Sequence, residues 1–146
     1  MQLNEDLEKL GESVFTESAV ESVRLPSTLK RIEDGMFYEC WNLRSIEIPS
    51  SVECIGSWCF CKSEIEEILF PAALREIDES AFRGCKELKR VTFAPGSRLE
   101  RIGPKCFGET GIEAIVIPKG VEEIPNNEFR GCVSLKEVLL EEGSRL

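Results

Sequence analysis

The chain has 146 residues, of which 42% are hydrophobic and 31% charged, which excludes a disordered chain and is enough for one domain with a buried core. No apolar run approaches the roughly 18–20 residues that span a bilayer, and the N-terminus MQLNEDLEKL lacks the basic start and apolar stretch of a secretory signal, so no membrane insertion is expected. A net charge of −9 disfavours binding to nucleic acid or anionic lipid. The expected partner is therefore a protein.

Six phenylalanines recur every 22–25 residues and mark six copies of one repeat: Phe15, Phe37, Phe60, Phe82, Phe107 and Phe129. Each copy has two aliphatic residues three apart, then the phenylalanine, a small residue three further on, and an aliphatic stretch of the form LxxIxI that often ends in proline. The period-two stretch predicts strands at 20–25, 43–48, 65–70, 88–93, 112–117 and 135–140. The aliphatic pair predicts a short second strand or extended segment, and the residues around phenylalanine an irregular or 3₁₀ turn on the opposite side.

The copies alternate between two kinds, so the true unit is a pair of turns. Copies one, three and five carry glycine after the second aliphatic residue and a hydroxyl three residues after phenylalanine: Gly11, Gly56 and Gly103, and Ser18, Ser63 and Thr110. Copies two, four and six have other residues at these positions: Glu33, Asp78 and Pro125, and Cys40, Cys85 and Cys132. We expect the glycines to adopt positive φ and the hydroxyls to bond loop amides.

Seven cysteines and no histidine argue against a metal centre, because Cys54, Cys59 and Cys61 have neither a CxxC partner nor a histidine. The repeat explains five of the thiols as small buried residues: Cys40, Cys59, Cys85, Cys106 and Cys132. Cys54 and Cys61 fall at variable positions and are expected to be the exposed thiols. So many unpaired thiols favour an intracellular, reducing compartment, although the sequence leaves the localisation open.

The stretch LKRIEDGMFYECWNLRSIEIP, residues 29–49, and its relatives resemble the BspA-like class of leucine-rich repeats, and the resemblance extends from Leu7 to Leu146. It implies a curved solenoid in which one strand from each repeat joins a parallel sheet, with few or no long helices. It also implies protein recognition or adhesion, since many bacterial and protist members are cell-surface proteins. The whole chain, 1–146, is expected to be one such solenoid domain.

Two columns of side chains are predicted to point outward from the strands. One becomes largely apolar after the second copy, through Leu69, Thr92, Val116 and Leu139, and the other contains Arg90 and Glu137. We predict that these six residues form a protein-binding surface; ordinary surface variation, or cover by a missing segment, is the alternative.

Residues 83–105 contain seven basic and two acidic side chains, a local charge of +5 in a chain of −9. Such asymmetry could attract an acidic partner or let copies of the chain associate. A solvated turn surface is the alternative interpretation.

The final stretch VLLEEGSRL repeats VTFAPGSRL at 91–99, after which a new copy begins. Leu146 is therefore expected to open a seventh, incomplete repeat that leaves the C-terminal end of the solenoid open. We expect either a longer solenoid or a partner over the last strand.

These patterns favour a non-catalytic protein-binding or scaffolding module, possibly a subunit of a larger assembly. The alternative is a segment of a cell-surface adhesin. An enzyme is disfavoured and no cofactor is expected, because the chain has no histidine and no GxxxxGK[ST] phosphate loop.

Overall fold

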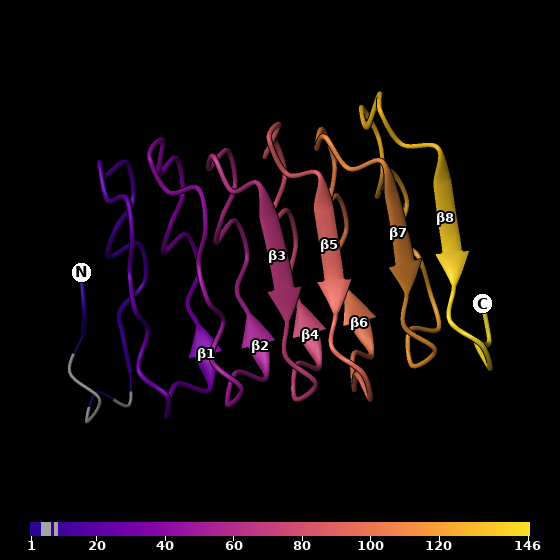
Figure 1. The fold of residues 1–146 in the computed structure, drawn as a ribbon, viewed down its shortest axis with the longest axis horizontal. Coiled ribbons are helices and arrows are strands. Elements are labelled where there is room, and N and C mark those ends of the chain that lie inside the picture. Colours follow the sequence, from indigo (N-terminus) through magenta and orange to yellow (C-terminus); the bar gives the residue numbers. More distant parts are fainter. Residues whose placement is uncertain (4–6, 8) are drawn as a thin grey trace.

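The computed structural model describes residues 1–3, 7 and 9–146, and the copies stack side by side along one axis (Figure 1). One parallel sheet has the strand order β1-β2-β4-β6 and consists of Arg31–Ile32, Cys54–Ile55, Glu76–Ile77 and Arg101–Ile102. The other has the order β3-β5-β7-β8 and consists of Glu67–Phe70, Arg90–Phe93, Ala114–Ile117 and Glu137–Leu140. The strands of the two sheets run in opposite directions (Figure 1), and no described residue lies in a helix. The predicted solenoid is confirmed.

A column of stacked phenylalanine rings fills the interior. Neighbouring rings from Phe15 to Phe107 lie 5.0–5.7 Å apart between centroids and within 18° of parallel. Phe70 of β3 meets Phe82 edge-on at 5.5 Å, which joins the column to the larger sheet. Because each repeat buries its aliphatic residues only against its neighbours, the stack shares one continuous core.

The third side of the solenoid consists of tight turns around each phenylalanine. Every copy places two residues in the left-handed region, one two residues before phenylalanine and one two residues after it: Ser13, Glu17, Gly35, Glu39, Trp58, Lys62, Ser80, Gly84, Lys105, Glu109, Asn127 and Gly131. The turns bond to one another through the chain, as when the Phe37 N–H donates to the Cys59 carbonyl at 2.7 Å. This third side is irregular and not 3₁₀, because positive φ interrupts that helix.

The expectation of positive φ was wrong for Gly11, Gly56 and Gly103, and two of these glycines, Gly56 and Gly103, instead allow close approach of neighbouring turns. A Cβ on Gly103 would lie 2.5 Å from the Glu79 nitrogen and 2.6 Å from the Asp78 carbonyl carbon. Gly56 meets the backbone of the second copy in the same way. A side chain cannot fit because the backbone of the preceding turn occupies its place.

Replacing Gly103 by alanine should therefore push two turns apart and lower the free energy of unfolding by about 2 kcal/mol, the range typical of overpacking. Gly96→Ala is a useful contrast, since Gly96 has positive φ but open space around its Cβ. Urea denaturation followed by circular dichroism would measure both. A Gly103→Ala variant as stable as the parent would contradict the close packing of these turns.

Hydroxyls and thiols join each odd copy to the even copy that follows. Ser63 Oγ lies 3.5 Å from Cys85 Sγ, and the Cys85 thiol donates to the Phe60 carbonyl at 2.9 Å. The same contacts recur between Ser18 and Cys40 and between Thr110 and Cys132. The sequence predicted that these hydroxyls bond loop amides, but they contact thiols of the next copy instead. The reason is that the hydroxyl side chains point along the stack.

Proline decides which neighbouring strands pair. The Ala94 N–H donates to the Phe70 carbonyl and the Glu141 N–H donates to the Ile117 carbonyl, each at 3.0 Å, and these bonds close fully paired ladders. Pro49, Pro71 and Pro118 occupy the equivalent position elsewhere and have no N–H to donate. At Pro118 the ladder between β5 and β7 reduces to the single pair Arg90 and Ala114.

The strands predicted at 20–25 and 43–48 were wrong for this reason. In the first of these stretches only Arg24 pairs, in a bridge to Gln2, and the second has no strand residue. The other four predictions are confirmed, each strand beginning two residues later than expected. Pro125 has the same effect on the smaller sheet, because Gly103 N donates to the Ile77 carbonyl but Pro125 cannot donate to Ile102. In copy one the segment predicted over the aliphatic pair, 7–10, lies partly outside the described residues, because residue 8 is not described.

Candidate protein-binding surface

The predicted apolar column lies exposed on the larger sheet. Leu69 is 59% exposed, and Val116 and Leu139 are each 49% exposed. Leu69 pairs with Thr92 across β3 and β5, and Val116 pairs with Leu139 across β7 and β8. The backbone therefore fixes all four side chains on one face, while their alternating neighbours Ile68 and Ile115 are buried. A rigid, partly apolar surface of this kind can contact another protein with little loss of its own conformational freedom.

Arg90 and Glu137 lie on the same face, one pleat earlier in their strands. Arg90 forms an exposed ion pair with Glu67 at 2.6 Å and is the residue that pairs with Ala114. Ala114 in turn pairs with Glu137. All six predicted residues thus share one face, and their role in binding stays a prediction.

Three hollows mark the larger sheet. The first is bordered by the charged residues Arg44, Glu66, Lys89 and Glu113, and a second lies beside Ser45, Glu67 and Leu69. The third, of about 340 Å³, lies between β5 and β7 and is the most apolar of the three. Its lining includes Val91, Phe93, Val116 and Pro118. Sequence reasoning did not identify this hollow, because it depends on the parallel register of the strands.

The last described strand has little cover. All four residues of β8 are exposed, including Val138 and Leu140, which lie in register with the buried Ile115 and Ile117. Val133, in the turn before it, is 95% exposed. Side chains that form the core in other copies are thus accessible in β8.

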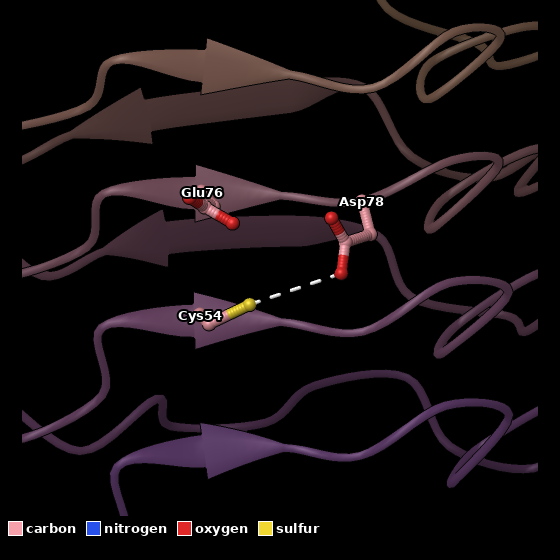
Figure 2. Close-up of side chains that lie close together, drawn as sticks. All are labelled: Cys54, Glu76 and Asp78. Carbon is pink, nitrogen blue, oxygen red and sulfur yellow. Dashed lines mark hydrogen bonds between the residues drawn. The ribbon is translucent and has the colours of Figure 1, made fainter.

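Cys54, Glu76 and Asp78 come together on the smaller sheet, with candidate ligand atoms all within 4.8 Å of one another (Figure 2). Arginines occupy this cluster: Arg31 donates to Cys54 Sγ at 2.6 Å and Asp78 Oδ2 at 3.1 Å, and Arg101 contacts both carboxylates. Burial raises the pKa of the Cys54 thiol to about 11, although Arg31 acts in the opposite direction. With its acids paired and its thiol protonated, the cluster serves as an ion-pair network across neighbouring repeats.

The thiols are largely interior. Cys40, Cys59, Cys85 and Cys106 are fully buried as predicted, and Cys132, in the sixth copy, is partly buried. The expectation of an exposed thiol was wrong for Cys61, which is 1% exposed. Its side chain is covered by the neighbouring turns, although its position varies among the copies. Burial raises the pKa of the Cys61 thiol to about 11 and that of Cys85 to about 12, so neither is an activated nucleophile.

A buried carboxylate was missed by sequence reasoning. Glu128 occupies the position before phenylalanine that Cys59, Ala81 and Cys106 fill in other copies, and it is 2% exposed. Its carboxylate accepts the N–H groups of Cys106 at 3.2 Å and Phe107 at 2.9 Å. Burial raises its pKa to about 7, against the effect of these hydrogen bonds. An alignment of the six copies at their phenylalanines reveals this acid at a position where the other copies have uncharged residues.

A stack of short repeats with two parallel sheets and a third side of phenylalanine-centred turns defines a leucine-rich-repeat solenoid. The chain belongs to the BspA type leucine rich repeat family, of which six copies match residues 3–143. The resemblance read from the sequence is thereby confirmed.

Solved structures show the same fold. The pneumococcal vaccine antigen PcpA is 36% identical with a TM-score of 0.79, and the match covers 84% of this chain and 31% of that one. A leucine-rich repeat protein from Bacteroides ovatus ATCC 8483 is 20% identical with a TM-score of 0.61, over 98% of this chain and 61% of that one. This chain thus spans less than two thirds of either protein. No curated protein matches the chain.

The described residues form no helix that could span a membrane. Together the family and its solved relatives support a repeat module of the kind used for protein binding or adhesion.

Proposed function

We propose that this chain is a non-catalytic protein-binding module that contacts its partner through the larger sheet. The observation that carries the proposal is the aligned, exposed column of Leu69, Thr92, Val116 and Leu139 on a backbone held by neighbouring repeats. Exposed aliphatic side chains in a line are costly in water, and contact with a partner removes that cost. Arg90 and Glu137 flank the column and supply polar contacts at its border.

Arginine substitutions test the column. The variant Leu69→Arg with Val116→Arg places two charges in the proposed contact and should weaken partner binding by about 2 kcal/mol or more, the scale of an interface hot spot. The partner would first be captured from native extract by the parent chain, and its affinity then measured by calorimetry.

Val14→Arg is the matched control, because Val14 is exposed to the same 49% as Val116 but lies in a turn of the first copy. The control should bind the partner as tightly as the parent does. If the column variant also binds as tightly as the parent, the proposed surface is wrong. Thermal denaturation of both variants separates lost contact from lost folding.

A second contact surface is proposed at β8, whose four residues are exposed. Another strand, from a further repeat, a partner or a second copy, can add beside β8 and cover Val138 and Leu140. Leu140→Arg in the same binding measurement separates this strand from the sheet column. Concentration-dependent sedimentation of the parent chain that Leu140→Arg removes would identify self-association.

The alternative function is that of a segment of a cell-surface adhesin. Its support is the 36% identity to a vaccine antigen. Antibodies to the chain should then label intact cells without permeabilisation. Labelling only after permeabilisation would favour the reducing compartment suggested by the free thiols.

A further inference from the structure

The hollow between β5 and β7, here called the β5–β7 seam, has a specific cause. Neighbouring pairs of strands are closed by the N–H groups of Ala94 and Glu141, and Pro118 lacks the corresponding donor. The Phe93 carbonyl therefore cannot receive the bond that Phe70 and Ile117 receive. β7 pairs with β5 only at Arg90 and Ala114. The two strands lie further apart than β3 and β5 or β7 and β8 (Figure 1).

The wider spacing of β5 and β7 exposes part of the core in the seam. Phe93 pairs with Phe70 across β3 and β5, yet Phe70 is fully buried whereas Phe93 is only partly buried. Val91, Val116 and Pro118 complete an apolar lining around a volume of about 340 Å³. A bulky apolar side chain entering the seam would lose its water contacts on several sides.

The charges at the two ends of β5 indicate which partner would fit. Lys89 precedes the strand and Arg98 lies in the loop after it, and neither forms an ion pair with a described carboxylate. Glu141 also lines the seam, and its carboxylate accepts the Lys119 N–H at 2.9 Å but keeps its negative charge. Carboxylates of a partner would therefore be attracted to Lys89 and Arg98 and repelled by Glu141.

From this geometry we infer that the β5–β7 seam binds an extended acidic segment of a partner protein, with a bulky apolar side chain of that segment inserted over Phe93. The Phe93 carbonyl accepts an N–H from the segment in place of the donor that Pro118 lacks, as in other cases of strand addition. Acidic residues on either side of the inserted side chain face Lys89 and Arg98. This inference rests on the proposed binding function of the larger sheet and names the class of segment that the sheet takes.

The test uses capped eight-residue peptides and the ¹⁵N-labelled chain observed by NMR. One peptide places Glu residues on both sides of a Leu-Phe pair, a second replaces Glu by Lys, and a third replaces Leu-Phe by Ala-Ala. We expect the first peptide alone to shift the amide signals of Val91, Thr92, Phe93 and Val116. Equal shifts with the Lys peptide would overturn the acidic class, and shifts with none of the peptides would overturn the seam as a binding site.

The variant Pro118→Ala tests the cause of the opening. It supplies an N–H that can bond to the Phe93 carbonyl and close the seam, so the new amide at position 118 should be protected from hydrogen exchange and the peptide affinity should fall about tenfold or more. Pro71→Ala is the matched control, since it restores the same donor at another junction and should leave binding to the seam unchanged. An unprotected amide at position 118, or unchanged peptide affinity in Pro118→Ala, would contradict the inference.

Two further outcomes separate this inference from the proposed function. If the Leu69→Arg with Val116→Arg variant loses its protein partner while no peptide enters the seam of the parent chain, the larger sheet binds protein and the seam proposal alone fails. If the parent chain dimerises and Pro118→Ala abolishes the dimer, the occupant is a second copy and the assignment to a separate partner is wrong.

Discussion

Replacing Phe82 by alanine should lower the free energy of unfolding by about 3–5 kcal/mol, as for other buried phenylalanines. Phe82 is fully buried, stacks between Phe60 at 5.0 Å and Phe107 at 5.7 Å, and meets Phe70 edge-on. Removal of the ring leaves a cavity in the centre of the stack and breaks the aromatic column into two parts. Urea denaturation followed by circular dichroism measures the loss.

The position of Phe82 in the stack adds a second expectation. A repeat solenoid is stabilised by contacts between neighbours, so a defect in the middle uncouples the two halves, and unfolding should lose cooperativity. Phe129→Ala is the matched control, because Phe129 is only partly buried at the end of the stack. A loss for Phe82→Ala no greater than that for Phe129→Ala would contradict the phenylalanine column as the core of the fold.

The repeat period was sufficient to predict the solenoid, because every copy must bury the same few aliphatic residues against its neighbours. The phenylalanine spacing located the core column, and the alternating LxxIxI pattern located the outward side chains Leu69, Val116 and Leu139. Both signals are local in sequence, and they recur from copy to copy.

Contacts between copies were harder to predict. Position 103 must be glycine because the backbone of Asp78 and Glu79, in the preceding copy, leaves no room for a Cβ. The sequence of the copy that contains Gly103 does not show this contact. Proline presents the same difficulty, because Pro118 ends its own strand but removes the bond to Phe93 of the strand before. The consequence becomes visible only when the parallel register is known.

The seam therefore depends on two features that lie far apart in the sequence. Phe93 provides the apolar floor, and Pro118 keeps the neighbouring strand from covering it. The substitution Pro118→Ala should weaken peptide binding and leave the fold intact, because the other ladders of the sheet do not depend on residue 118.

The stability of the chain should also fall as the pH rises from about 5 to 8, by roughly 3 kcal/mol. Burial raises the pKa of Glu128 to about 7 from the ordinary value of 4.5, so the folded chain holds a proton that the unfolded chain has released. The stabilisation that comes from protonated Glu128 is complete below about pH 4.5 and is lost as the pH rises through 7. Chemical denaturation at a series of pH values would measure this slope.

Glu128→Gln should remove the slope, because the amide keeps an oxygen for the Phe107 N–H but cannot ionise. Glu123→Gln is the matched control, since Glu123 lies exposed in the same copy. Glu39 and Glu109 do not interfere, because hydrogen bonds from Lys62 and Arg83 lower their pKa values and move their effect below the range tested. A slope that persists in Glu128→Gln would mean that another group takes up the proton, and Glu128 would then be buried in its ionised form, held by the backbone N–H groups of the preceding turn.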